Sequence, residues 1–148
     1  MSAKRFERIA VFGGTHGNEL TGVSLLRKWR GDPSALRRST FQAEPFLSNP
    51  RAVEENRRYI HRDLNRCFLL KDLANPELSG YEENRAKVIN QRFGPKENPA
   101  YDLLIDLHTT TANMGGTVII ERDDWFGRKI AAYVAEIAAE TAIIAYTG

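Results

Sequence analysis

The stretch that decides the fold is Val11-Phe12-Gly13-Gly14-Thr15-His16-Gly17-Asn18-Glu19, an apolar run that breaks at a pair of glycines. Residues 9–12 are continuously apolar, a pattern typical of a short strand that is buried on both faces. After the glycines come a histidine and, three positions later, a glutamate, where a helix predicted over residues 19–29 begins. A strand that leads directly into a helix favours an α/β fold.

The rest of the chain continues this alternation of strands and helices. Strands are predicted over residues 41–47, 101–107, 117–120 and 141–146, and helices over 81–93 and 124–139. Residues 52–70 are rich in Arg and Asn and are compatible with a helix, a loop or both. The pattern predicts an α/β fold with a mostly parallel or mixed sheet flanked by helices, in one domain over residues 1–148. That domain either ends with its last strand or is cut short.

Composition excludes several classes of protein. The 148 residues include 21 Lys and Arg against 19 Asp and Glu, a net charge of +2 that argues against nucleic acid or an anionic membrane as partner. No apolar stretch is long enough to span a membrane, and residues 1–8 lack the features of a signal peptide. The single cysteine, Cys67, precludes an intrachain disulfide and is interpreted as an apolar filler rather than a nucleophile. We therefore expect a cytoplasmic protein.

Two histidines and a glutamate follow predicted strands. His16 and Glu19 come after the first strand, and His108 ends the strand at 101–107. Open α/β sheets bind ligands at the carboxyl ends of their strands. Two histidines and one carboxylate are the protein ligands of many catalytic zinc ions. Asp106 lies two residues before His108, on the same side of the strand, where it could hold a ligand histidine by a hydrogen bond.

Spacing alone leaves other interpretations open. Asn18 or Glu19 could cap the helix, and His108 could be an ordinary hydrogen-bonded histidine at a strand end. His61 lies among charged residues and is expected to be solvated rather than a ligand.

A second group of candidates lies in the polar segment. Arg57, Arg58, Asn65 and Arg66 could bind an anionic substrate, because the planar guanidinium pairs with a carboxylate through two parallel hydrogen bonds. The alternative is a solvated basic face.

Six ordered blocks carry a family resemblance over nearly the whole chain. They are Gly13-Gly14-Thr15-His16-Gly17-Asn18-Glu19-Leu20-Thr21-Gly22, Asn49-Pro50-Arg51-Ala52-Val53, Arg58-Tyr59, Asp63-Leu64-Asn65-Arg66, Phe93-Gly94-Pro95-Lys96, and Asp106-Leu107-His108 with Thr110-Thr111-Ala112-Asn113-Met114-Gly115. With these blocks the chain resembles aspartoacylase and the N-acyl-aromatic-amino-acid amidohydrolases, and more distantly succinylglutamate desuccinylase and the zinc carboxypeptidases.

The resemblance implies roles for individual residues. It implies a zinc carboxypeptidase-like fold with one zinc per chain, held by His16, Glu19 and His108. It places the substrate carboxylate on Arg58, Asn65 and Arg66. Thr109 departs from the family, because mammalian members have Asn directly after the zinc histidine. We expect this change to alter the fit of the substrate rather than metal binding.

The resemblance also implies what lies outside the chain. Family members are longer and carry the general-base Glu and a C-terminal β-rich domain beyond the region that corresponds to residue 148. The sequence thus looks like the N-terminal half of an enzyme that hydrolyses the amide bond of N-acyl amino acids such as N-acetylaspartate. The implied partner is a small anionic substrate, and a homo-oligomer is left open. The alternatives are an inactive fragment that binds zinc and anions, and a metal-free interaction module.

Overall fold

The computed structural model describes residues 6–110, 115–121, 124–138 and 142–145. The chain divides into two compact units, residues 1–109 and residues 110–148. Each unit is built on a parallel sheet, and each is described by itself below.

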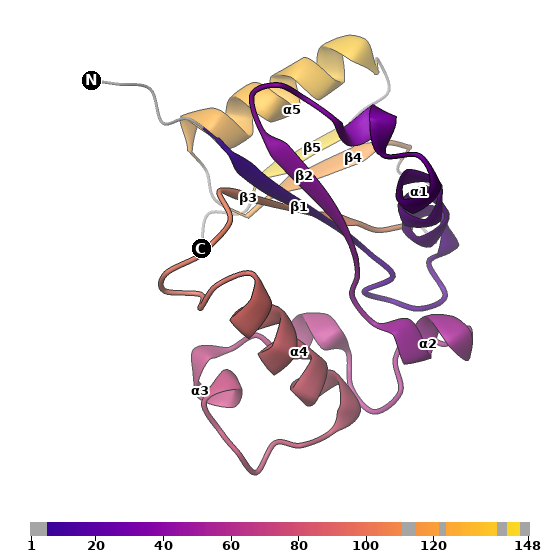
Figure 1. Ribbon diagram of the computed structural model, residues 1–148, viewed down its shortest axis with the longest axis vertical. Coiled ribbons are helices and arrows are strands. Elements are labelled where there is room, and N and C mark those ends of the chain that lie inside the picture. The colour runs from indigo at the N-terminus through magenta and orange to yellow at the C-terminus, as the bar shows by residue number, and fades with distance from the viewer. Residues whose placement is uncertain (1–5, 111–114, 122–123, 139–141, 146–148) are drawn as a thin grey trace. The chain divides into compact units, whose positions relative to one another are not determined.

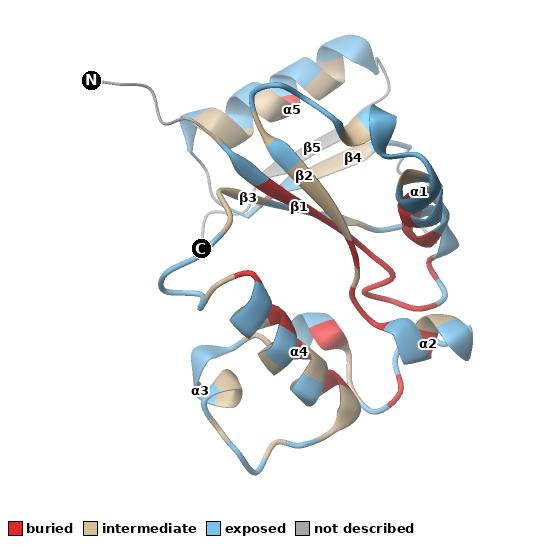
Figure 2. Cartoon of the chain, viewed as in Figure 1, coloured by how far each residue is buried: buried red, intermediate tan, exposed pale blue. Residues whose placement is uncertain are grey.

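The first unit contains a three-stranded parallel sheet of order β2-β1-β3 (Figure 1). Its strands are β1 (Arg8–Gly13), β2 (Gln42–Leu47) and β3 (Leu103–Leu107). The central strand β1 is buried from Ile9 onward, as its continuous apolar run predicted (Figure 2). Phe12 pairs in register with Phe46 of β2 and with Asp106 of β3. The prediction of an α/β fold with a parallel sheet is therefore confirmed.

Helix α1 (Leu20–Gly31) makes the crossover from β1 to β2 and buries Val23 and Leu26. Two glycines allow it to lie close to the sheet. A Cβ on Gly13 would come 2.9 Å from the backbone carbon of Gly22, and a Cβ on Gly22 would come 3.0 Å from the Cβ of Leu107. Both distances are shorter than ordinary packing allows. This close approach fixes α1, and with it the turn that precedes α1, against the ends of β1 and β3.

The connection from β2 to β3 holds most of the remaining helical structure. It contains α2 (Pro50–Glu54), a 3-10 turn at Leu64–Arg66, α3 (Leu70–Leu73) and α4 (Tyr81–Arg92). A further 3-10 turn, Pro33–Leu36, follows α1. The segment 52–70, which the sequence left open, is thus mainly loop between short helical pieces. The sequence analysis missed α2, whose Asn49 side chain accepts a hydrogen bond from the N–H of Ala52, and also α3.

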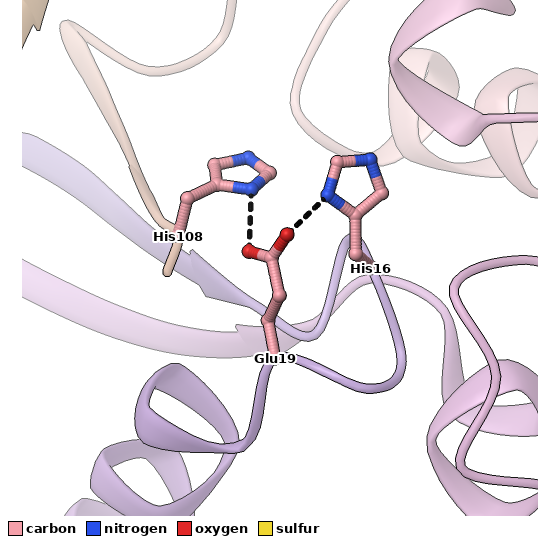
Figure 3. A group of neighbouring side chains, drawn as sticks. All are labelled: His16, Glu19 and His108. Carbon is pink, nitrogen blue, oxygen red and sulfur yellow. Dashed lines mark hydrogen bonds and ion pairs between the residues drawn. The ribbon is translucent and has the colours of Figure 1, made fainter. Parts of the chain in front are cut away.

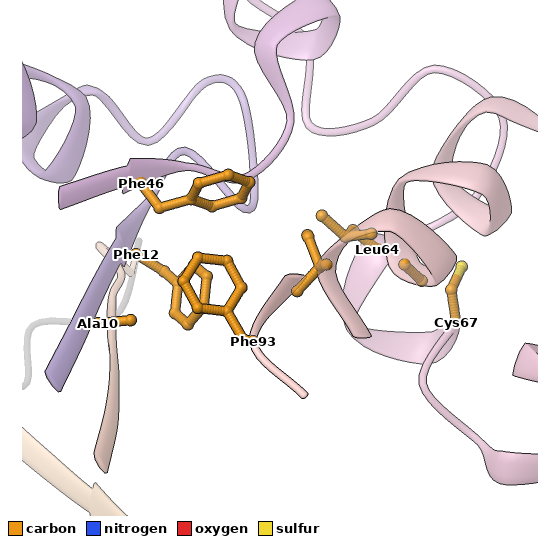
Figure 4. Packing of buried hydrophobic residues seen from close by; sticks show 8 residues of the cluster. Ala10, Phe12, Phe46, Leu64, Cys67 and Phe93 are labelled. Carbon is orange, nitrogen blue, oxygen red and sulfur yellow. The ribbon is translucent and has the colours of Figure 1, made fainter. Parts of the chain in front are cut away.

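The core of this unit lies between the sheet and α4 (Figure 4). Phe93, at the end of α4, packs edge-on against Phe12 and Phe46 with ring centroids 4.8 and 4.9 Å away. Cys67 is buried in the same cluster, and burial raises the pKa of its thiol to about 11. It is therefore an inert core residue, as the sequence predicted.

The second unit is a short β-α-β element. Strand β4 (Thr117–Ile120) pairs in parallel with β5 (Ala142–Ala145), and α5 (Trp125–Ile137) connects them. Asp124 caps α5 by accepting a hydrogen bond from the N–H of Gly127 at 2.8 Å. The predicted helix and last strand of this region are present, although residues 139, 141 and 146 of those predictions lie outside the described residues. Among the described helices, none combines the length and the apolar character needed to cross a bilayer.

Candidate metal centre

The turn after β1 places His16 and Glu19 just beyond the end of the strand. Gly14 adopts a positive φ of 68°, a conformation that suits glycine, and so begins the turn. Glu19 is the residue before α1, yet its side chain makes no capping hydrogen bond. It turns instead toward two histidines, so a capping role for this side chain is excluded.

His16, Glu19 and His108 converge on one point (Figure 3). The Nδ1 atom of His16 lies 2.7 Å from one Glu19 oxygen, and the Nδ1 atom of His108 lies 2.9 Å from the other. One ligand atom from each of the three residues lies within 4.8 Å of the others. His16 and Glu19 are buried, whereas the side chain of His108 is about one-third exposed. The structure thus brings the three predicted metal ligands together.

Each histidine is held from its far side by an aspartate. The Nε2 atom of His16 lies 3.1 Å from Asp63, and the Nε2 atom of His108 lies 2.8 Å from Asp106. Asp106 therefore occupies the supporting position proposed for it, and Thr15 donates a hydrogen bond to it at 2.9 Å. The sequence analysis did not foresee that Asp63 would support His16. The only signal in the sequence was that Asp63 belongs to the Asp63-Leu64-Asn65-Arg66 block. Asp63 lies 47 residues after His16 along the chain.

The close contacts in this group shift the pKa values of one histidine and two carboxylates. Hydrogen bonding to Asp106 raises the pKa of His108 to about 9, with a further contribution from Glu19. Burial would raise the pKa of Glu19, but the N–H of Thr109 and the two histidines outweigh it and lower that pKa. Burial would likewise raise the pKa of Asp63, but hydrogen bonds from His16 and from the N–H of Asn65 outweigh it and lower that pKa. Glu19 and Asp63 are therefore held in their ionised forms.

Of the predicted anion-binding residues, Arg58 contacts this group. Arg58 is about half-exposed, with its guanidinium 3.6 Å from Glu19 and 3.3 Å from Asp63. Asn65 and Arg66 lie exposed on the 3-10 turn that follows Asp63. Arg57, by contrast, pairs with Glu55 at 3.3 Å.

One other histidine is among the described residues. His61 is exposed and accepts a hydrogen bond from the N–H of Tyr81 at 3.1 Å, so it is not among the converging ligands, as expected. Residues 111–114 of the last family block lie outside the described residues.

Comparison with known proteins identifies relatives of the chain. The model of the succinylglutamate desuccinylase/aspartoacylase catalytic domain matches residues 5–148. A probable aspartoacylase from Trichodesmium erythraeum is 48% identical over 134 residues, which cover 90% of this chain and 46% of the relative. Aspartoacylase from Mus musculus is 52% identical over 119 residues, which cover 78% of this chain and 38% of that protein.

Solved structures agree with this relationship. Murine aminoacylase 3 matches with a TM-score of 0.89 and 40% identity, covering 97% of this chain and 48% of that one. Succinylglutamate desuccinylase from Vibrio cholerae matches with a TM-score of 0.71 at 20% identity, which shows a shared fold. The chain spans half or less of the length of these relatives. It belongs to the family of the succinylglutamate desuccinylase/aspartoacylase catalytic domain.

Proposed function

We propose that this chain is the metal- and carboxylate-binding part of a zinc-dependent amidohydrolase that acts on N-acyl amino acids. The observation that carries the proposal is the convergence of His16, Glu19 and His108 at the ends of two parallel strands. Relatives named aspartoacylase and N-acyl-aromatic-L-amino acid amidohydrolase support the reaction class. N-acetylaspartate is therefore the first substrate to test.

The donor set suits zinc. Imidazole nitrogens and one carboxylate oxygen are ligands that Zn²⁺ accepts, and three protein ligands leave a position for water. Asp63 and Asp106 hold the Nε2 atoms of His16 and His108, which orients both Nδ1 atoms toward Glu19. When bound, zinc would lower the pKa of a coordinated water and polarise the substrate carbonyl.

The chain's own residues would bind and orient the substrate. Arg58 lies beside Glu19, so its guanidinium is placed to pair with a substrate carboxylate close to the metal. Asn65 and Arg66, exposed on the adjoining 3-10 turn, would add further donors. Glu19 faces both histidines and is thereby assigned to the metal rather than to proton transfer.

A second candidate function is binding of zinc and anions without hydrolysis. It is favoured by the engagement of all three carboxylates that contact the two histidines. Glu19 faces both rings, Asp63 pairs with Arg58, and Asp106 accepts from Thr15. Each of these three carboxylates therefore already has a partner, and none of the three is free to act as a general base.

The first test is metal analysis of the chain and of two variants. We expect one zinc per chain, and a loss of affinity of several kcal/mol in His16→Ala and in His108→Ala, because a three-ligand site cannot readily replace a ligand. His61→Ala is the matched control, since His61 lies outside the group, and it should bind zinc normally. Unchanged zinc affinity in both ligand variants would refute the assignment.

The second test is hydrolysis of N-acetylaspartate and of N-acetylated aromatic amino acids. The assay compares residues 1–148 with a fusion that joins them to the part of the Trichodesmium relative that the chain does not match. Hydrolysis by the zinc-loaded fusion supports the amidohydrolase. Tight binding of zinc and N-acetylaspartate without hydrolysis by the fusion supports the second candidate. We also propose a cytoplasmic location, and the oligomeric state can be measured on the same proteins.

A further inference from the structure

Glu82, in the first turn of α4, is a buried carboxylate to which the proposed reaction gives no role. Its exposed fraction is 0%. One oxygen accepts from the Asn49 amide at 3.1 Å and from the N–H of Ile60 at 2.6 Å. The other accepts from the N–H of His61 at 2.9 Å and from the N–H of Arg62 at 3.2 Å. Both oxygens are therefore used, and every one of these donors is neutral.

The backbone N–H groups of three consecutive residues, 60–62, thus donate to one side chain, that of Glu82 in α4. The donors at residues 60–62 lie in a loop with no ladder or helix of its own to hold it. Because both oxygens accept, the carboxylate fixes the loop's orientation as well as its distance from α4. Burying a charge costs free energy, and here the four hydrogen bonds offset that cost while they fix the geometry of the loop.

The loop that Glu82 holds is the one that carries the anion-binding residues. Arg58 lies two residues before it, and Asn65 and Arg66 follow it closely. The same loop contacts the turn between β1 and α1 at two further points. We call this turn, residues 14–19, the metal turn. The N–H of Gly17 donates to the carbonyl of Arg58 at 3.2 Å, and Asp63 contacts His16. Glu82 holds the same loop at a third point, which is on α4.

Glu82 is also connected to the metal turn through Asn49. The Asn49 side chain that donates to Glu82 also caps α2, and the Asn49 N–H donates to the carbonyl of Gly14 at 3.2 Å. A shift of the Glu82 carboxylate would therefore be transmitted to both sides of the proposed substrate site.

We propose that Glu82 is a positioning residue for the substrate carboxylate, which by clamping residues 60–62 sets where Arg58, Asn65 and Arg66 lie relative to the metal ligands. This inference rests on the proposed function. A displacement of about 1 Å in such a group can cost on the order of a hundredfold. We therefore expect a loss in substrate affinity of at least about tenfold when the clamp is weakened.

The experiment uses the full chain at saturating zinc and compares three variants with the wild type. Glu82→Gln keeps the shape but turns one acceptor into a donor that faces backbone N–H groups. Glu82→Asp keeps two acceptors on a shorter side chain. Glu83→Gln is the matched control, because it removes the same charge from the next position. There the Glu83 carboxylate lies 3.6 Å from the Arg62 guanidinium. Calorimetry gives the Kd for N-acetylaspartate, metal analysis gives the zinc content, and hydrogen exchange reports on the N–H groups of residues 60–62.

We expect Glu82→Gln to keep one zinc per chain, to exchange residues 60–62 faster, and to bind N-acetylaspartate at least about tenfold more weakly. Glu82→Asp should bind more tightly than Glu82→Gln, and Glu83→Gln should match the wild type. The inference is overturned if Glu82→Gln binds N-acetylaspartate like the wild type, if exchange at residues 60–62 is unchanged, or if Glu83→Gln loses as much affinity. A wild-type chain that takes up no zinc would overturn the proposed function itself, before any variant is compared.

Discussion

At the scale of single residues, the two histidines of the metal centre share one arrangement. Each directs Nδ1 toward Glu19 and has Nε2 held by an aspartate. The aspartates fix the ring orientation and hold a proton on Nε2, so that a metal would bind at Nδ1 by displacing the proton there. We therefore expect the aspartates to support metal binding through the histidines that they hold.

Replacing one of these aspartates should weaken metal binding without removing a ligand. We expect Asp106→Asn to reduce zinc affinity by about 10–100-fold, because Asn gives His108 a weaker acceptor and no charge. The measurement is competition for zinc with a chelator of known affinity. Asp32→Asn, which makes the same change at a cap far from the group, should leave zinc affinity unaltered. Equal affinity in Asp106→Asn and the wild type would contradict the supporting role.

Arginine geometry at the substrate site can be tested in the same way. Arg58→Lys and Arg66→Lys keep the charge but lose the two-pronged donor, so each should bind N-acetylaspartate about tenfold more weakly, roughly 1.4 kcal/mol. Arg57→Lys is the control, because Arg57 pairs with Glu55. Titration calorimetry on zinc-loaded protein gives the affinities. Wild-type binding by both Arg58→Lys and Arg66→Lys would mean that these arginines are simply solvated.

At the scale of elements, the turn after β1 requires glycine at position 17, because α2 passes very close to it. A Cβ on Gly17 would lie 2.0 Å from the backbone carbon of Ala52. No side chain can rotate away to relieve this clash, because the neighbour is main chain. The contact locks the metal turn against α2, and the hydrogen bond from Gly17 to the Arg58 carbonyl lies beside it.

Gly17→Ala should therefore destabilise the chain by at least about 2 kcal/mol, near the upper part of the usual range for overpacking. It should also weaken zinc binding, because His16 is the adjacent residue. Gly31→Ala is the matched control, since nothing lies within 4 Å of a Cβ at that position in α1. Urea unfolding of both variants checks the prediction. Similar midpoints for the two proteins would show that the turn can move aside.

The sequence predicted those elements whose signals are local. Strand β1, helix α1 and strand β4 follow from apolar runs and helical spacing, and the structure confirms them. Helix α2 has only five residues and depends on its Asn49 cap and on packing, so periodicity cannot reveal it. In the site, the local pair His16 and Glu19 was visible in the sequence. The contacts of Asp63 with His16 and of Glu82 with residues 60–62 join distant segments, which only the fold brings together.

At the scale of the whole molecule, stability should depend on pH through buried carboxylates. Burial would raise the pKa of Glu82, but hydrogen bonds from Ile60, His61, Asn49 and Arg62 outweigh it and lower that pKa below its ordinary 4.5. A carboxylate with a lowered pKa in the folded state contributes stability above its ordinary pKa and loses it as the pH falls further.

We therefore expect Glu82→Gln to be about 1–3 kcal/mol less stable than the wild type at pH 7, with a difference that shrinks as the pH falls below about 4. The difference between the two proteins isolates Glu82 from other carboxylates that titrate in the same range. Urea unfolding at several pH values provides the data, and Glu83→Gln should show a smaller effect. A difference that is independent of pH would contradict the assignment.

The 148 residues on their own should be poor catalysts. We expect zinc-loaded chain to hydrolyse N-acetylaspartate far more slowly than the roughly 10 per second of an ordinary enzyme. Glu19, Asp63 and Asp106 are all engaged, and positioned proton transfer typically contributes about 10²–10⁴-fold. The measurement is release of aspartate, with metal-free chain as the blank. Turnover near the ordinary rate would mean that one of the engaged aspartates is the base. Loss of that turnover in zinc-saturated Asp63→Asn or in zinc-saturated Asp106→Asn would identify which one.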